Sequence, residues 1–230
     1  MQTITETIVA LRQNRFDFEV IVVLDSVPGD QTGSMTHELC AKFAELRLIE
    51  RPGKRGVGNA VKTGISAAEG DILAIVMADY SECPNDLVKL LRAVAQGYDM
   101  AIGDRFGNGK PHNYPFPKYI VNRCYNLLIK LIFAVASFDT TNAFKAYNAR
   151  ILRQINISSK GFEVFAEIPL GVFLRVPRAN ITSISVKHSV RKKREAKLSL
   201  LKEGPRYIRI VASMFFTAKI KKNYQSIDGQ

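Results

Sequence analysis

Apolar runs of strand length alternate along this chain with segments whose apolar residues repeat at helical spacing. The predicted strands are 18–24, 46–50, 72–78, 98–102 and 180–188. The predicted helices are 3–14, 33–46, 85–96, 119–136, a segment ending near 176, and 205–222. The run at 72–78 is apolar on both faces, which is typical of a parallel sheet covered by helices. The pattern therefore predicts an α/β fold.

A carboxylate follows two of the predicted strands. Asp79 ends the run that begins at Ile72, and Asp25 ends the run that begins at Phe18, each before a polar loop. Ligands of open α/β sheets bind beyond the carboxyl ends of the strands, and parallel neighbours bring those ends together. We therefore expect Asp25 and Asp79 at the same edge of one mixed sheet. The alternative for Asp79 is that it caps the helix at 86–91.

The segment 51–64 places glycines between a strand and a helix, with Lys54 and Arg55 among them. Such glycines let backbone N–H groups approach a phosphate, and the cations add charge. The spacing is neither GxGxxG nor the Walker pattern, so those nucleotide folds are not indicated. A solvated turn before an amphipathic helix explains the same residues, and both interpretations stay open here.

Composition and charge limit the chemical classes of partner that this protein is expected to bind. The 230 residues are 47% hydrophobic, enough for a buried core, and carry a formal net charge of +12. That charge favours phosphate esters, nucleic acid or an anionic membrane surface. The three cysteines lack metal-binding spacing, which predicts a reducing, cytoplasmic environment. Residues 1–15 have no signal-peptide core, and the apolar stretches 127–135 and 208–216 are too short to span a bilayer. A soluble or peripheral protein is expected.

Three middle segments are candidates for parts of a site. The polar loop 107–117 is long enough to be a lid. Aromatic residues bracket polar ones at 138–147, as in a pocket wall. Glu163 and Glu167 are four residues apart and share one helix face.

Two basic segments close the chain. One is 191–197, and the other is a basic amphipathic helix whose apolar residues can share one side: Ile208, Val211, Phe215 and Phe216. Such a helix is typical of a membrane-surface element, but it can also pack its apolar side on the domain. We expect one domain, residues 1–200, with an appendage at 201–230.

Several segments occur in a familiar order: the strand ending at Asp25, Arg51 with the glycines up to Gly70-Asp71, Met77-Ala78-Asp79, and Gly103-Asp104-Arg105-Phe106. This order resembles family 2 glycosyltransferases of the GT-A fold. The later segments 139–145, 160–167 and 191–198 resemble the dolichol-phosphate mannose synthase branch. The resemblance covers about residues 3–200. It implies a GT-A-like, Rossmann-like fold with a mixed, mostly parallel sheet flanked by helices, followed by the basic C-terminal helix.

That branch moves a sugar from a nucleotide diphosphate sugar to a polyprenyl phosphate. The resemblance therefore implies a hexosyltransferase that binds peripherally at the cytoplasmic face of an anionic membrane. A membrane-protein partner or an oligomer is compatible with this interpretation. A departing diphosphate needs its charge neutralised, usually by a divalent metal and cations. Mg²⁺ or Mn²⁺ is the expected cofactor, because both prefer oxygen ligands.

The chain departs from the family pattern at four places. The family opens with a strand that carries a Pro-x-Tyr-Asn-Glu-like loop, and we expect this chain to lack that strand and to start at the first helix. Leu24-Asp25 and Met77-Ala78-Asp79 each lack the first acid of the corresponding family motif. The segment Arg191 to Lys197 keeps its terminal cations but lacks the family's glycine and serine.

The resemblance assigns roles to individual residues. Asp79 is the expected metal ligand, and Asp25 the contact to the base or ribose. A lipid phosphate is already an oxyanion and needs cations rather than a general base. Asp139 and Glu167 are candidates for sugar-hydroxyl contacts, with a structural role as the alternative. The remaining expected nucleotide-sugar contacts are Arg51, Gly58, Lys62 and Ala78, and the expected acceptor contacts are Arg105, Arg191 and Lys197.

Two other classes of function stay open. A nucleic-acid-binding protein is suggested by charge alone, but the aromatic interleaving of an RNA-binding sheet is lacking, and no nucleic acid is expected. A catalytically degenerate partner or scaffold subunit of the same fold is the other alternative, because the motif acids are incomplete.

Overall fold

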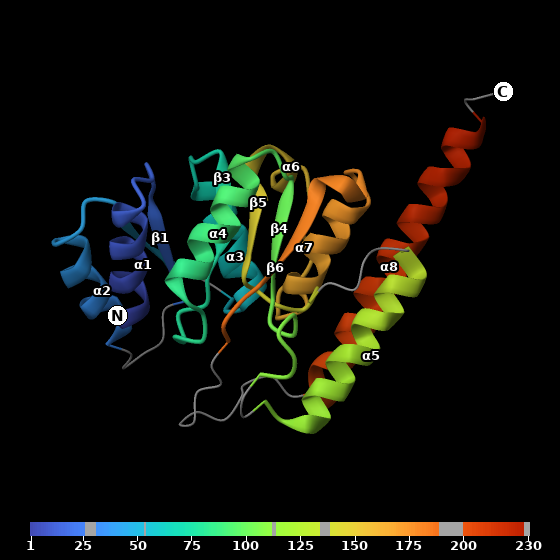
Figure 1. The fold of residues 1–230 in the computed structure, drawn as a ribbon, viewed down its shortest axis with the longest axis horizontal. Coiled ribbons are helices and arrows are strands. Elements are labelled where there is room, and N and C mark those ends of the chain that lie inside the picture. Colours follow the sequence, from blue (N-terminus) through green and yellow to red (C-terminus); the bar gives the residue numbers. More distant parts are fainter. Residues whose placement is uncertain (26–30, 53, 112–113, 134–138, 189–199, 228–230) are drawn as a thin grey trace.

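The computed structural model describes residues 1–25, 31–52, 54–111, 114–133, 139–188 and 200–227 (Figure 1). Its centre is a four-stranded sheet in the order β3 (Ile72–Ile75), β5 (Lys145–Asn148), β4 (Met100–Asp104), β6 (Ile181–Ser185). β5 is antiparallel to both of its neighbours, and β6 is parallel to β4. Three of the four strands therefore run in one direction, as expected for a mixed, mostly parallel sheet.

A second, two-stranded parallel sheet pairs β1 (Val20–Asp25) with β2 (Leu46–Arg51). One continuous sheet was expected, and this was wrong, because no hydrogen-bonded ladder joins β1 to β3 among the described strands. All residues of β1 are only half-buried, although most of them are apolar. Each of β1 and β3 thus has one edge that no described strand covers.

Helices cover both sheets. α1 (Gln2–Gln13) packs on α4 (Pro84–Ala95), α2 (Thr32–Cys40) lies on β2, and α3 (Val57–Ala67) contacts β1. α4 and α1 bury one apolar cluster against the central sheet. A larger cluster lies where α7 (Val164–Phe173) and the short α6 (Ala149–Leu152) meet β5. A 3-10 turn, Arg178–Asn180, precedes β6.

Two long helices, α5 (Phe116–Phe133) and α8 (Leu200–Ile227), lie side by side at one end of the molecule (Figure 1). They share a small core in which Ile129 of α5 and Ile210 and Val211 of α8 pack with Leu170 of α7. The Tyr207 hydroxyl of α8 donates to the carbonyl of Phe162, 2.8 Å away. This part of the C-terminal helix therefore packs on the domain.

The apolar side chains of α8 do not all share one side as expected. Val211 is 4% exposed, whereas Ile208 and Phe216 are 64% and 62% exposed. The helix has apolar residues on both its packed and its open side. No helix in the described part of the chain combines the length and the hydropathy that a bilayer span requires.

Three predicted elements differ from the structure. The helix predicted over 33–46 ends at Cys40. β3 ends at Ile75, so Asp79 lies in the turn after the strand rather than at its last residue. The segment 138–147, expected as a pocket wall, ends in strand β5, and residue 138 lies outside the described residues.

The glycines at the start of α3 are needed for close packing. The amide of Gly58 donates to the carbonyl of Lys160 at 3.0 Å, and a Cβ at residue 58 would meet the Ser159 carbonyl at 2.6 Å. Gly56 has φ +150°, and its Cβ would meet the Lys160 carbonyl at 2.4 Å. Glycine at both positions lets α3 begin directly against the 158–161 loop.

We expect Gly58→Ala to lower the free energy of unfolding by about 1–3 kcal/mol, since the new methyl group must displace backbone. Urea unfolding followed by circular dichroism measures the change. Gly64→Ala in the same helix is the matched control: its Cβ would lie 3.5 Å from Val23, and alanine favours a helix. Equal stabilities of the two variants would show that the contact of Gly58 is not tight.

Candidate active site

Charged side chains from four segments meet at one end of the central sheet. The carboxyl ends of β3, β4 and β6 point to this end, and so does the start of the antiparallel β5. The loops at this end carry the charged residues Asp79, Glu82, Arg105, Asp139, Lys145 and His188. Their charges act on one another: the pKa of Arg105 responds to Asp139 and Glu82, and that of Glu82 responds to Asp79.

A buried ion pair joins Arg105 to Asp139 at the centre of this cluster. Arg105 Nε lies 2.5 Å from Asp139 Oδ2, and Arg105 Nη2 lies 2.8 Å from Oδ1. Burial alone would raise the pKa of Asp139, but the guanidinium holds it below its ordinary value. The carboxylate in turn raises the pKa of Arg105. The planar fork of Arg105 is therefore occupied by Asp139, and both residues keep their charge.

The loop that carries Asp139 is fastened to α5. Asn126 Oδ1 accepts hydrogen bonds from the Thr140 amide at 2.9 Å and the Thr140 hydroxyl at 2.7 Å. Asn122 Nδ2 donates to Thr141 Oγ1 at 2.5 Å. These contacts fix the position of the ion pair relative to the long helix.

Lys145 is fully buried beneath the ion pair. Its ammonium donates to the carbonyl of Thr140 at 3.2 Å and also to that of Asn142. Burial lowers its pKa to about 7, and Asp139 opposes that shift. The charged and neutral forms of Lys145 are therefore close in free energy at neutral pH.

The side chain of Glu82 bonds back to the start of the turn that contains Asp79. Its Oε2 accepts from the Met77 amide at 3.0 Å, and its backbone forms an isolated bridge with His188. Burial raises the pKa of this carboxyl to about 8, and the Asp79 charge adds to the shift. At neutral pH the proton stays on Glu82, so this carboxyl group adds no negative charge to the turn.

Asp79 is exposed at the mouth of the cluster, next to exposed Ala78. Its Oδ1 accepts from the Ser81 amide at 3.1 Å and the Ser81 hydroxyl at 2.7 Å. The capping alternative does not hold, because α4 begins at Pro84 with Cys83 at its N-cap. Within the described ranges no group of three His, Cys, Asp or Glu side chains could hold a metal. Asp79 is therefore one accessible carboxylate, which suits a metal whose other ligands come from substrate phosphates and water.

A second cluster forms where β1 and β2 end. Asp25 Oδ1 pairs with Arg51 Nη1, and Asp25 Oδ2 accepts from the Gly56 amide at 2.8 Å. Arg51 Nε also donates to Thr63 of α3 at 3.0 Å. The amides of Gly56 and Gly58 are both engaged within the protein, so these two N–H groups serve packing rather than phosphate contact in this structure. Asp25 and Arg51 are brought together as a pair.

Glu167 has the structural role that was the alternative to a sugar contact. It is 1% exposed, and its carboxylate accepts from the Ser158 amide, the Ser158 hydroxyl and the Ser159 amide at 2.6–2.9 Å. These bonds shape the loop against which Gly56 and Gly58 pack. Glu167 thus supports the start of α3 from within the core.

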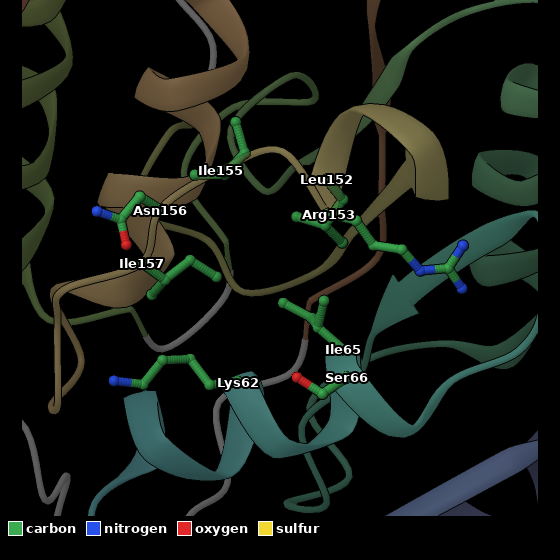
Figure 2. A pocket seen from close by; sticks show the side chains of 8 residues that line it. All are labelled: Lys62, Ile65, Ser66, Leu152, Arg153, Ile155, Asn156 and Ile157. Atoms are coloured by element: carbon green, nitrogen blue, oxygen red, sulfur yellow. The ribbon is translucent and has the colours of Figure 1, made fainter.

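Lys62 lines a separate pocket of about 480 Å³ between α3 and the segment 152–157 (Figure 2). Isoleucines form much of its wall, and the Arg153 guanidinium points away to the carbonyls of Ala68 and Gly70. None of the other predicted site residues lines this pocket. Arg191 and Lys197 lie outside the described residues.

Three charged residues of the site were not singled out from the sequence. Glu82 and Lys145 are ordinary in their sequence context, and only their burial distinguishes them. Arg123 of α5 stands over the Phe106 ring, 5.8 Å from its centroid, and Arg105 stands 5.4 Å from the same centroid. The sequence feature that could have identified Arg123 is a single arginine among the apolar residues of the predicted helix 119–136.

Comparison with known proteins identifies relatives. The sequence profile described as "Glycosyl transferase family 2" matches residues 1–155. A dolichol-phosphate mannosyltransferase of Pyrococcus furiosus is 25% identical over 185 residues, which are 79% of this chain and 51% of that protein. A polyprenol monophosphomannose synthase of Mycolicibacterium smegmatis is 31% identical over 150 residues, 62% of this chain and 57% of the relative. This chain therefore spans between half and two thirds of the length of these two relatives.

A third relative and the solved structures complete the comparison. An undecaprenyl-phosphate mannosyltransferase of Micrococcus luteus is 30% identical over 169 residues, 70% of this chain and 69% of that protein. The structure superposes on glucosyl-3-phosphoglycerate synthase of Mycobacterium tuberculosis with a TM-score of 0.65 at 16% identity, covering 91% of this chain and 74% of that one. A complex of that enzyme with Mn²⁺, UDP-glucose and phosphoglyceric acid gives 0.64 at 18% identity and the same coverage. At these identities the likeness shows the shared fold alone, and that fold is the expected GT-A-like α/β fold.

The pH dependence of stability at His188 tests the electrostatics of the cluster. Burial, aided by the Arg105 charge, lowers its pKa from 6.5 to about 4. Between these two values the unfolded chain binds a proton that the folded chain does not, so stability falls as the pH falls from 6.5 to 4. Glutamine cannot take up that proton. We expect His188→Gln to lose less stability than the parent protein across this window, measured as urea midpoints at several pH values. Parallel curves for the two proteins would contradict a buried neutral imidazole.

Proposed function

This chain belongs to glycosyltransferase family 2, and we propose that it transfers a sugar from a nucleotide diphosphate sugar to a polyprenyl phosphate. The observation that carries the proposal is the charged cluster at the sheet end. There an accessible carboxylate, Asp79, lies at the same end of the sheet as the cations Arg105 and Lys145. This combination suits a reaction between two phosphate-bearing substrates. The names of the relatives, which are mannosyltransferases acting on polyprenyl-type lipids, support the same substrate classes.

Asp79 is the proposed protein ligand of a divalent metal that arrives with the donor. A bound Mg²⁺ or Mn²⁺ would neutralise the charge that develops on the leaving diphosphate. The Asp79 Oδ1 atom is oriented by Ser81, which leaves Oδ2 directed to no other described side chain. Glu82 stays protonated beneath the turn and holds the Met77 amide, so it positions Asp79 without competing as a second charge.

Asp25 and Arg51 are the proposed contacts to the base or ribose of the donor. Their ion pair lies at the ends of β1 and β2 and is half-buried, so each retains polar atoms toward solvent. Lys62 and Gly58 remain proposed donor contacts by family position only. Lys62 lines its own pocket, and the Gly58 amide is already bonded.

The acceptor phosphate is proposed to bind near Arg105, with Arg123 and the 191–197 segment completing the cationic side. The acceptor needs no general base, because a lipid phosphate is already ionised at neutral pH. Arg105 is held rigidly by Asp139, so its charge is positioned before the phosphate arrives. An approaching phosphate would also favour the charged form of Lys145. Peripheral binding at the cytoplasmic face of the membrane would bring such an acceptor to the site.

A non-catalytic partner subunit is the second candidate. The observations that favour it are Met77 at the position of a motif acid and the occupied fork of Arg105. Calorimetry with a panel of nucleotide sugars separates the two candidates. A catalytic protein binds one of these donors and transfers its sugar, whereas a scaffold does neither.

We expect Asp79→Asn to weaken donor binding in the presence of Mn²⁺ by about tenfold or more, since a charge-assisted contact is worth roughly 1.5–3 kcal/mol. Asp25→Asn should weaken it less, because Asp25 is not the metal ligand. Isothermal titration with and without EDTA gives both values. Asp71→Asn, an exposed carboxylate before β3, is the matched control. Equal donor affinity of the parent with and without EDTA would count against a metal at Asp79.

We expect Arg191→Ala and Lys197→Ala each to raise the KM for a short polyprenyl phosphate about tenfold, on the same magnitude for a charge-assisted contact. Donor affinity should barely change, because these cations are proposed to bind the acceptor rather than the donor. The control is Lys42→Ala, which removes an exposed lysine after α2. Unchanged transfer by both variants would mean that the basic segment does not hold the acceptor.

A further inference from the structure

The turn that carries Asp79 contains a strained residue. Tyr80 has a backbone φ of +63°, in the left-handed region, and Arg15 is the other non-glycine residue of the described chain with a positive φ. A bulky side chain disfavours this conformation, which persists only where the surrounding structure holds it. Contacts elsewhere in the fold must therefore hold the residue that directly follows Asp79.

Helix α1 supplies such contacts through the side chain of Tyr80. The Tyr80 hydroxyl donates to Glu6 Oε1 at 2.9 Å and accepts from Gln2 Nε2 at 3.0 Å. Gln2 Nε2 also donates to the same Glu6 oxygen at 2.9 Å. These three side chains form a closed set of hydrogen bonds between α1 and the turn, which we call the Tyr80 latch. Its acceptor on Glu6 is a carboxylate, and hydrogen bonds to an ionised group are stronger than those between neutral groups.

The other half of α1 is anchored on the fold. Leu11 is 4% exposed and belongs to the apolar cluster that α1 shares with α4. Arg12 makes two hydrogen bonds of 2.7 Å to Glu45, directly before β2. Asn14 Oδ1 accepts from Arg92 of α4 at 2.7 Å. The Tyr80 latch therefore ties the turn to a helix that is itself fixed in position.

The other hydrogen bonds of the turn are local. Asp79 Oδ1 accepts from the amide and the hydroxyl of Ser81, and Glu82 Oε2 accepts from the Met77 amide. Both contacts join residues of the same turn, whereas the latch joins it to a residue 74 positions away in the sequence. If φ of residue 80 relaxed to a negative value, the chain on either side would rotate and redirect the Asp79 carboxylate. The latch therefore acts on the direction in which Asp79 points.

We propose that Tyr80 is a positioning residue: through the Tyr80 latch, α1 holds the turn in its left-handed conformation and so orients Asp79 toward the divalent metal of the donor. The role toward the metal rests on the proposed function, whereas the latch itself rests on the hydrogen bonds of Tyr80, Glu6 and Gln2. Without the latch, only a fraction of the molecules would hold the turn in the competent conformation. The apparent affinity for a metal-bound donor falls in proportion to that fraction.

The test is calorimetry of the full chain with GDP, UDP and ADP, each in Mn²⁺ and in EDTA. Tyr80→Phe keeps the ring and the left-handed strain but loses the hydroxyl, so nucleotide affinity in Mn²⁺ should fall about three- to tenfold, with little change in EDTA. Tyr80→Asn and Tyr80→Gly remove more of the side chain, yet both new residues tolerate a positive φ. They should therefore bind closer to the parent than Tyr80→Phe does. The control is Tyr98→Phe, which removes the hydroxyl of another exposed tyrosine and should bind like the parent.

Two results would overturn the positioning role. One is equal affinity of Tyr80→Phe and the parent in Mn²⁺. The other is weaker binding by Tyr80→Asn and Tyr80→Gly than by Tyr80→Phe, because the lost side chain rather than the backbone conformation would then set the affinity.

A stability cycle tests the latch without any ligand. Tyr80→Phe and Glu6→Ala remove the same hydrogen bond, so the urea midpoint of the double variant should fall by less than the sum of the two single losses. Additive losses would show that the latch does not form. A parent that binds none of the nucleotides while the losses are non-additive would refute the proposed function and leave the latch standing.

Discussion

The buried Arg105–Asp139 pair is the interaction on which the site depends. Removing either partner would leave an uncompensated charge in the core, which is far more costly than losing a surface pair. The pair also affects the protonation of two neighbouring side chains. Asp139 favours the charged form of Lys145, and Arg105 opposes protonation of His188. Because Asp139 already satisfies the fork of Arg105, a phosphate bound as proposed would meet a rigid, partly neutralised cation. Specificity for an anion must then come from the cations that surround the pair.

The sequence predicted the local elements better than their pairing. Alternating apolar runs and helical segments predicted the correct α/β class. Asp25 was correctly placed at the end of its strand, whereas Asp79 lies in the turn after β3. The separation of β1–β2 from β3 was missed, because pairing between distant strands leaves no local pattern. β5 was missed for a related reason. Lys145 belongs to the segment 138–147, which was expected as a pocket wall, and the carbonyls of Thr140 and Asn142 make its burial tolerable.

Site residues were harder to predict than the fold, because side-chain type does not reveal the bonding partner. Glu167 looked like a possible sugar contact, yet its acceptors are filled by the backbone and hydroxyl of the 158–159 loop. Gly58 looked like a phosphate contact, yet its amide bonds Lys160. Glu82 looked unremarkable, yet burial keeps it protonated beneath Asp79. In each case a contact or a degree of burial that only the folded chain creates decides the role.

The charged cluster and an exposed apolar surface of α5 share one support in this fold. Asn122 and Asn126 project from the inward side of α5 to Thr141 and Thr140, while the outward side carries exposed apolar side chains. α5 is also packed on α8 and α7 through a small apolar core. Any rotation of α5 would therefore displace the threonines and, with them, the carboxylate that holds Arg105. A surface that fixes the orientation of α5 would, for this reason, also hold the geometry of the charged cluster.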